Sequence, residues 1–269
     1  MTTRNLLLGL VAIITTGLWS CSSDDPVEVS VPSTYSFQRD GSSTVSYSGQ
    51  TQRLDMIAEM TSYGKGGTSE MLDEQKLLDM FRNENSPFSD ADLNQTGDSR
   101  KQIANKLYGQ GDGSTPVDGG ATQTYFENII KDLAAASLAN GNEAGNGTAG
   151  TLTSGSSTYL VNENGFEPVQ LLEKGLMGAL LFHQGTNVYL GPEKLGVSGT
   201  ELKDEKNYTT LEHHFDEAYG YYELPTDMSK FDDMGANKEL RFWAKYTYSA
   251  NGTDGVGYDI ANRIHDAFS

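Results

Sequence analysis

Cysteine is almost absent from the sequence, since Cys21 is the only one in 269 residues. A single cysteine excludes a disulfide within the chain, so the fold has to hold together without a covalent link of that kind. The residues around Cys21 also indicate that this thiol has a role other than catalysis. Thiol-based catalysis is therefore excluded as well.

Basic residues are also scarce. The chain has 19 Lys and Arg against 37 Asp and Glu, which gives a formal net charge of −18. Such an excess of negative charge repels phosphate backbones, so we expect no nucleic-acid partner. It favours cations, basic partners or simple solubility. Proline is scarce too, with 7 residues against 30 glycines, a composition typical of a loop-rich chain.

The common catalytic motifs are missing. The chain contains neither His-Glu-x-x-His nor Gly-x-Ser-x-Gly, the signatures of many zinc peptidases and serine hydrolases. The Gly-rich segment 109–113 is not followed by Gly-Lys-Ser/Thr, so it is not a phosphate-binding loop. These absences favour a protein that is not an enzyme, with a peptidase as a lower alternative that would need an open metal position and an activated water.

No apolar run is long enough for a membrane-spanning helix. The run at 6–14 follows Arg4, a combination typical of a secretory signal peptide. The tetrapeptide Leu-Trp-Ser-Cys at 18–21 resembles a bacterial lipoprotein box, which implies that Cys21 is diacylated and becomes the first residue of the mature chain. We therefore expect residues 1–20 to be a lipoprotein signal peptide. The alternative is an ordinary secretory signal with an incidental cysteine.

Residues 21–33 are predicted to be a flexible tether between the lipid anchor and the folded domain. The Ser-Ser-Asp-Asp sequence at 22–25 resembles the acidic tether that marks surface export in Bacteroidetes-type lipoproteins. It implies a lipid-anchored location at the bacterial outer membrane, facing the cell surface, with the periplasmic face as the alternative. The membrane, reached through Cys21, is then an expected partner.

Hydrophobic periodicity predicts a mainly α-helical body, a helical bundle over residues 34–269 that forms a single domain. A small β-hairpin is expected around Arg39-Asp40-Gly41 and a short strand at 159–161. Long Gly-rich loops separate the helices, and residues 140–158, almost all Gly, Asn, Ser, Thr and Ala, are predicted to be a mobile loop or a boundary. We expect helices over residues 50–63, 69–81, 98–108, 121–139, 168–190, 209–222, 237–250 and 257–268.

The helix at 168–190 is apolar on all sides at its centre, which predicts the buried central helix of the bundle. Its two glycines, Gly175 and Gly178, would each cost about 1 kcal/mol in an exposed helix. We therefore expect another helix to approach closely at these positions.

One predicted helix carries side chains suited to metal binding. At about 100° per residue, His213 and Glu217 are i,i+4 neighbours, and His214 and Glu217 are i,i+3 neighbours. Imidazole and carboxylate ligands suit zinc, iron, copper or nickel better than calcium. We expect a transition metal ion, iron or zinc, on His213, His214 and Glu217, with Asp216 as a ligand or as a group that orients an imidazole. Two additional candidate ligands are Glu212 and His183.

The alternative is that this cluster is a solvated polar face with His–carboxylate hydrogen bonds. Gly220 lies on the same face of the helix. A solvated face does not need a glycine, so we expect this face to meet a neighbouring helix or to form the wall of a site.

Two families resemble the chain. The sequence Glu212-x-His214-x-x-Glu217 resembles the Gly-x-His-x-x-Glu motif of imelysin-like proteins, which are associated with iron uptake, although Glu replaces the leading Gly. Longer segments resemble an uncharacterised family of Bacteroidetes-type lipoproteins, domain of unknown function 4856, which implies an exported α-helical domain without a known activity. These segments are residues 47–54, 173–180, 212–221 and 241–246.

Members of that family are longer at the C-terminus. This sequence ends at Ser269, directly after a predicted helix and without a Gly cap or a polar tail. A truncated chain and a complete, shorter variant both stay open.

Two functions of different classes follow. The first is an outer-membrane lipoprotein that binds a metal ion and serves iron or other metal uptake. The second is a non-catalytic lipoprotein that binds an envelope protein or a glycan, in which the His/Glu cluster is structural. In that case the aromatic residues near the C-terminus, such as Trp243, and the Gly-rich loops form the contact surface.

Overall fold

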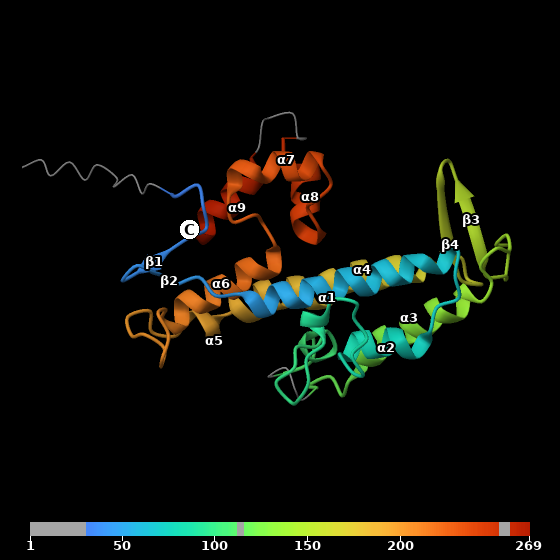
Figure 1. Ribbon diagram of the computed structural model, residues 1–269, viewed down its shortest axis with the longest axis horizontal. Coiled ribbons are helices and arrows are strands. Elements are labelled where there is room, and N and C mark those ends of the chain that lie inside the picture. The colour runs from blue at the N-terminus through green and yellow to red at the C-terminus, as the bar shows by residue number, and fades with distance from the viewer. Residues whose placement is uncertain (1–30, 112–115, 253–258) are drawn as a thin grey trace, which may run out of the picture. The chain divides into compact units, whose positions relative to one another are not determined.

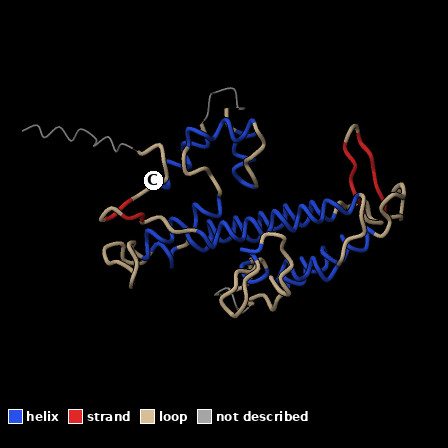
Figure 2. The backbone as a smooth tube through the Cα atoms, in the orientation of Figure 1, coloured by secondary structure: helices blue, strands red, loops and turns tan. Residues whose placement is uncertain are grey.

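A computed structural model describes residues 31–111, 116–252 and 259–269 (Figures 1 and 2). Residues Pro32–Ser269 form one compact unit. The predicted signal peptide and Cys21 lie outside the described residues. Within the larger unit the prediction of a mainly α-helical fold is confirmed.

Nine α-helices and one long π-helix lie within the described residues, and they are connected by loops and short 3₁₀ turns. None of these helices is both long and apolar enough to cross a membrane. The helices are α1 (Ser48–Lys65), α2 (Glu74–Arg82), α3 (Ala121–Ser137), α4 (Pro168–Leu176), the π-helix η4 (Met177–Tyr189), α5 (Pro192–Leu195), α6 (Thr210–Tyr222), α7 (Phe231–Ala236), α8 (Phe242–Ala250) and α9 (Ile260–Phe268).

The bundle is built around α1 and α4, which lie side by side (Figure 1). Helix α1 also packs against α2 and α6, α4 packs against α3, and η4 packs against α6. The core between them is apolar, and Leu54, Ile57, Leu172 and Leu176 are almost wholly buried in it. The predicted bundle is therefore present, and its core lies between helices that are far apart in the sequence.

The predicted central helix at 168–190 exists but has two halves. Pro168 starts α4, where a missing N–H costs nothing, and the chain changes to the π-helix η4 at Met177. The expected burial on all sides is wrong, because Phe182 is 51% exposed. The expected close approach holds at Gly175, which faces the ring of Phe126, but a Cβ at Gly178 would enter open space.

Two hairpins flank the helices. Strands β1 (Gln38–Arg39) and β2 (Ser42–Ser43) pair around Asp40 and Gly41, whose positive φ angles suit a two-residue hairpin turn. This hairpin was predicted. Strands β3 (Gly150–Ser154) and β4 (Ser157–Val161) form the second one, inside the segment 140–158 that composition predicts to be a loop, and β4 includes the predicted strand at 159–161.

The predicted helix at 98–108 is wrong, because only a 3₁₀ turn at Ala104–Lys106 forms there. The carbonyl groups of Lys101 and Gln102 instead accept hydrogen bonds from side chains elsewhere in the fold, those of Asn83 and Arg53. The apolar side chains of this segment, Ile103, Ala104 and Leu107, are nevertheless buried.

Two helix boundaries also differ from the prediction. Helix α2 begins at Glu74, and not at residue 69 as predicted, because the side chain of Asp73 caps it. The predicted helix at 237–250 forms only from Phe242 onward, as α8, because Lys238 has a positive φ angle and Arg241 contacts Glu223 and Asp55. Helix α7 comes before this break.

A second apolar cluster joins the first described residues to the C-terminal helices. Tyr35 and Tyr219 are buried in it together with Leu224, Phe231 and Ala261. The rings of Tyr35 and Tyr219 stack with their centroids 3.8 Å apart. The segment before α1 is therefore fastened onto α6.

Gly220 sets the distance between α6 and α1. A Cβ atom at Gly220 would lie 2.8 Å from Cβ of Tyr47 and 3.0 Å from Cβ of Gln50, and both of these atoms are fixed to the backbone of α1. We expect Gly220→Ala to lower the free energy of unfolding by about 1–2 kcal/mol, because the strain exceeds the gain in helix propensity.

Gly178→Ala is the matched control, since its Cβ would meet nothing within 4 Å. We expect this variant to be more stable by about 0.5–1 kcal/mol, because alanine restricts the unfolded chain. Urea unfolding of both variants measures the difference. Equal stabilisation by the two alanines would contradict the close approach at Gly220.

Candidate functional site

Helix α6 carries the predicted cluster, and its first turn is tightly capped. Thr209 accepts a hydrogen bond from the amide of Glu212, and Glu212 accepts one from the amide of Thr209, which is a complete capping box. Arg39 from β1 pairs with Glu212 at 2.7 Å, and the hydrogen bonds from Arg39 hold the pKa of that carboxyl below its usual value. Glu212, a candidate ligand, is thus engaged in the cap and in an ion pair.

Asp216 is turned away from the two histidines. Its carboxylate accepts hydrogen bonds from the hydroxyl of Tyr35 at 2.9 Å and from the amide of Ser46 at 2.8 Å. Burial raises its pKa from 3.8 to about 6. Asp216 therefore fastens the segment before α1 and does not contact the predicted metal ligands.

His214 and His183 are also directed elsewhere. Nδ1 of His214, a buried residue, lies 2.8 Å from the carbonyl oxygen of Lys194 on α5. The ring of His183 on η4 packs edge-on against Tyr108 at 5.3 Å, and burial lowers its pKa. Neither side chain lines the pocket described below.

His213 and Glu217 are the two predicted residues that the structure brings together. Nε2 of His213 lies 3.8 Å from Oε1 of Glu217, and the His213 ring stacks on Tyr208 with centroids 4.7 Å apart. Glu217 also accepts a hydrogen bond from Gln50 on α1 at 3.0 Å. Burial lowers the pKa of His213, and its Nδ1 is buried without a hydrogen-bond partner among the described residues.

The described residues contain no group of three or more His, Cys, Asp or Glu side chains arranged to hold a metal ion. The i,i+3 pair His214 and Glu217 diverges, because one side chain contacts α5 and the other contacts α1. The expectation that the face with Gly220 meets a neighbouring helix is confirmed, and that helix is α1.

A polar pocket of about 260 Å³ opens where α6 meets the start of α1. His213, Glu217 and Tyr208 form one wall, and Arg53 of α1 with Lys101 and Lys106 from the loop after α2 form another. The sequence offered no signal for the two lysines, because they come from a segment without a motif. Arg53 belongs to the segment 47–54 that carries the family resemblance, but spacing alone gave it no role.

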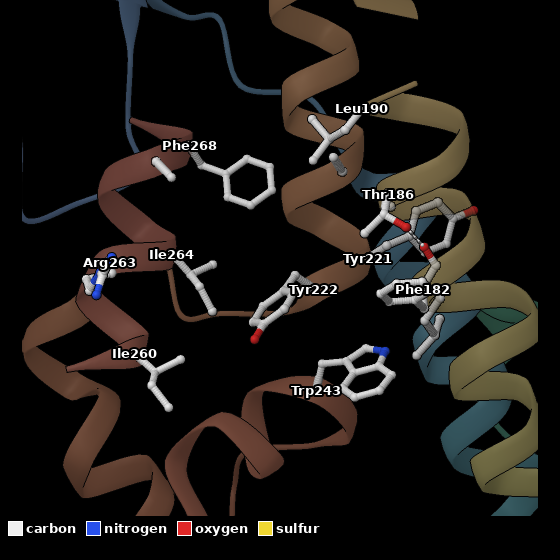
Figure 3. Close-up of a pocket in the computed structure, with 14 residues that line it drawn as sticks. Phe182, Thr186, Leu190, Tyr221, Tyr222, Trp243, Ile260, Arg263, Ile264 and Phe268 are labelled. Carbon is white, nitrogen blue, oxygen red and sulfur yellow. Dashed lines mark hydrogen bonds between the residues drawn. The ribbon is translucent and has the colours of Figure 1, made fainter. Parts of the chain in front are cut away.

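A second pocket, of about 600 Å³, is almost entirely apolar (Figure 3). Its lining includes Phe182 of η4, Leu190 directly after η4, Tyr222 of α6, Trp243 of α8 and Phe268 of α9. Among the aromatic residues near the C-terminus that were expected to form a contact surface, Trp243 lines this pocket and Phe242 is buried. Tyr246 is partly exposed, and Tyr248 packs on Phe231. These aromatic side chains do not form one common stacking surface.

Comparison with protein families identifies the chain. Residues 32–269 match the family model described as Domain of unknown function (DUF4856), so the chain belongs to that family and the predicted resemblance is confirmed. No curated protein and no solved structure matches it. The imelysin-like motif has no support from these comparisons. Two of the segments that resemble the family, 47–54 and 212–221, line the polar pocket together.

The raised pKa of Asp216 makes stability depend on pH. The folded chain holds this proton more tightly than the unfolded chain, so the contribution to folding is complete below pH 3.8 and is lost as the pH rises through about 6. Over that window we expect the wild type to lose roughly 3 kcal/mol of unfolding free energy that Asp216→Asn does not lose.

Urea unfolding at a series of pH values measures this difference. Asp98→Asn, at an exposed position, is the matched control and is expected to keep the wild-type slope. A wild-type slope in Asp216→Asn would contradict the role of the buried carboxylate.

Proposed function

We propose that this member of the DUF4856 family is a lipid-anchored binding protein of the bacterial outer membrane. In this proposal its helical domain holds a small polar ligand in the pocket between α1 and α6 and does not transform it. The observation that carries the proposal is the meeting of the segments 47–54 and 212–221 at one pocket. These are two of the four segments that resemble the family, and their side chains supply several of the pocket's donors and acceptors.

The pocket has the size and chemistry of a small-molecule site. Its volume of about 260 Å³ is at the lower end of the size of ligand pockets, which suits a small metabolite. Its walls offer an imidazole, a carboxylate, phenols and cationic groups, so a polar ligand finds partners on every side. Nδ1 of His213 lacks a partner among the described residues, and a ligand could supply one.

The binding proposal predicts that filling the pocket abolishes binding. Ser48 and Thr51 both lie exposed near the start of α1, but Ser48 lines the polar pocket and Thr51 does not. We expect Ser48→Trp to lose the thermal shift caused by those small polar metabolites that stabilise the wild-type chain, because its indole occupies the pocket. We expect Thr51→Trp to keep it.

Thermal-shift assays on the full chain in detergent check this with neutral, cationic and anionic metabolites. Binding that survives in Ser48→Trp would place the ligand elsewhere. A complete absence of ligands for the wild type would remove the proposal.

A metal ion is the second candidate, and the pair His213 and Glu217 favours it. The two side chains lie 3.8 Å apart, and one ring nitrogen of His213 is unpartnered among the described residues. A complete site for iron or zinc would need further ligands that these residues alone do not provide. Elemental analysis of the same sample tests this candidate. If the wild type holds one ion per chain and His213→Ala holds none, the ligand is a metal ion and metal uptake becomes the proposed function.

The location is proposed on the sequence around Cys21 alone. Cys21→Ser removes the thiol that acylation requires, so we expect the variant to leave the membrane fraction and become soluble. Fractionation of cells that express each form measures this. Retention of Cys21→Ser in the membrane fraction would contradict lipidation at Cys21.

A further inference from the structure

The polar pocket gathers positive charge in an acidic protein. Arg53, Lys101 and Lys106 line it, although the chain carries a net charge of −18. Among the described residues, none of these three cations forms an ion pair with a carboxylate. By contrast, a glutamate pairs with each of four other arginines, namely Arg39, Arg82, Arg100 and Arg241. Acidic side chains outnumber basic ones, so three neighbouring cations without a carboxylate partner are unexpected.

The fold holds these cations at the first turn of α1. Arg53 is only 6% exposed and donates hydrogen bonds to the carbonyl groups of Gly49 and Gln102, at 3.2 and 3.0 Å. The stem of Lys101 lies against Gly49, where a Cβ atom would be 3.1 Å from Lys101 Cε. Glycine at position 49 therefore lets a lysine cross the start of the helix.

The start of α1 adds to the positive potential. Tyr47 at the N-cap provides no side-chain hydrogen bond, and the first turn contains no acidic residue. The other long helix of the site, α6, caps its own amides with Thr209 and Glu212. The amide groups at the uncapped end of an 18-residue helix attract negative charge.

The charges of the pocket also act on buried neighbours. Burial raises the pKa of Tyr221, a residue that is 1% exposed, and the nearby guanidinium of Arg53 lowers it. Burial and repulsion from Arg53, Lys194 and Lys101 lower the pKa of Lys106, and attraction to the carboxylate of Glu217 offsets only part of this effect. An anion in the pocket would relieve this repulsion.

We propose that the pocket binds an oxyanion, the carboxylate or phosphate group of a small ligand, between Lys101, Lys106 and the first turn of α1. This inference rests on the proposed function, because it names the chemical class of the ligand for the same pocket. Glu217 and His213 on the opposite wall then face the rest of the ligand. A carboxylate there favours a ligand that carries a hydroxyl or ammonium donor beside its anionic group.

Isothermal titration calorimetry of the full chain at low ionic strength tests the inference. The probes are inorganic phosphate, sulfate and acetate, which separate phosphate-like from carboxylate chemistry. We expect saturable binding of at least one probe. Neutralising both lysines in Lys101→Gln/Lys106→Gln should weaken it by about tenfold or more, because each charged hydrogen bond contributes on that scale. Lys131→Gln, an exposed lysine on α3, is the matched control and should bind as the wild type does.

Ser48→Asp provides a second variant that does not depend on losing a charge from the fold. Its carboxylate would occupy the place of the ligand at the first turn of α1. We expect this variant to melt at a higher temperature than the wild type and to have lost the anion binding. A stable variant that does not bind excludes unfolding as the cause.

Three outcomes would overturn the inference: no saturable binding of any probe, wild-type binding by the double lysine variant, or wild-type binding by Ser48→Asp. Suppose that one of these outcomes occurs, but neutral metabolites still bind the wild type and Thr51→Trp and do not bind Ser48→Trp. The inference about the oxyanion is then wrong, and the proposed binding pocket stands. If Ser48→Trp binds every ligand as the wild type does, both are wrong.

Discussion

The close contact between α6 and α1 at Gly220 is the constraint on which the site depends. Without a side chain at this position, the backbone of α6 approaches Tyr47 and Gln50 closely enough for Gln50 to bond Glu217. The same approach brings His213 into one pocket with the cations near the start of α1. Any larger residue would separate the helices, and the pocket walls would then no longer face one another.

The site also illustrates how a chain with a large net charge can contain a region of the opposite sign. Several arginines of the helical domain form an ion pair with a nearby carboxylate, as Arg82 does with Glu127. In the pocket, Arg53 instead donates a hydrogen bond to a carbonyl group, and the aliphatic stem of Lys101 packs against Gly49. Net charge therefore describes the protein's solubility and long-range field, while the preference of a site is set by the few charges that surround it.

Much of the fold followed from the sequence, because its signals are local. The turn at Asp40-Gly41, Pro168 at the start of α4 and the helix that carries His213 were all readable from spacing and residue type. The site was readable only in part. Helical spacing correctly paired His213 with Glu217, but the partners of His214 and Asp216 come from α5 and from the segment before α1. Lys101 and Lys106 were missed because long-range packing alone brings them to α1, and the same packing replaced the helix expected there with a 3₁₀ turn.

The way in which the chain enters the domain has a mechanical consequence. Ser33 and Tyr35 bond the backbone of Met228 and Thr226, and the Tyr35 hydroxyl bonds Asp216. A pull on the chain at its entry into the domain would therefore be borne by α6 and the loop that follows it. Hairpin β1–β2 and helix α1, which come next in the sequence, would carry little of that load. A force applied through a tether at this end would therefore leave the geometry of α1, which forms part of the pocket, unchanged.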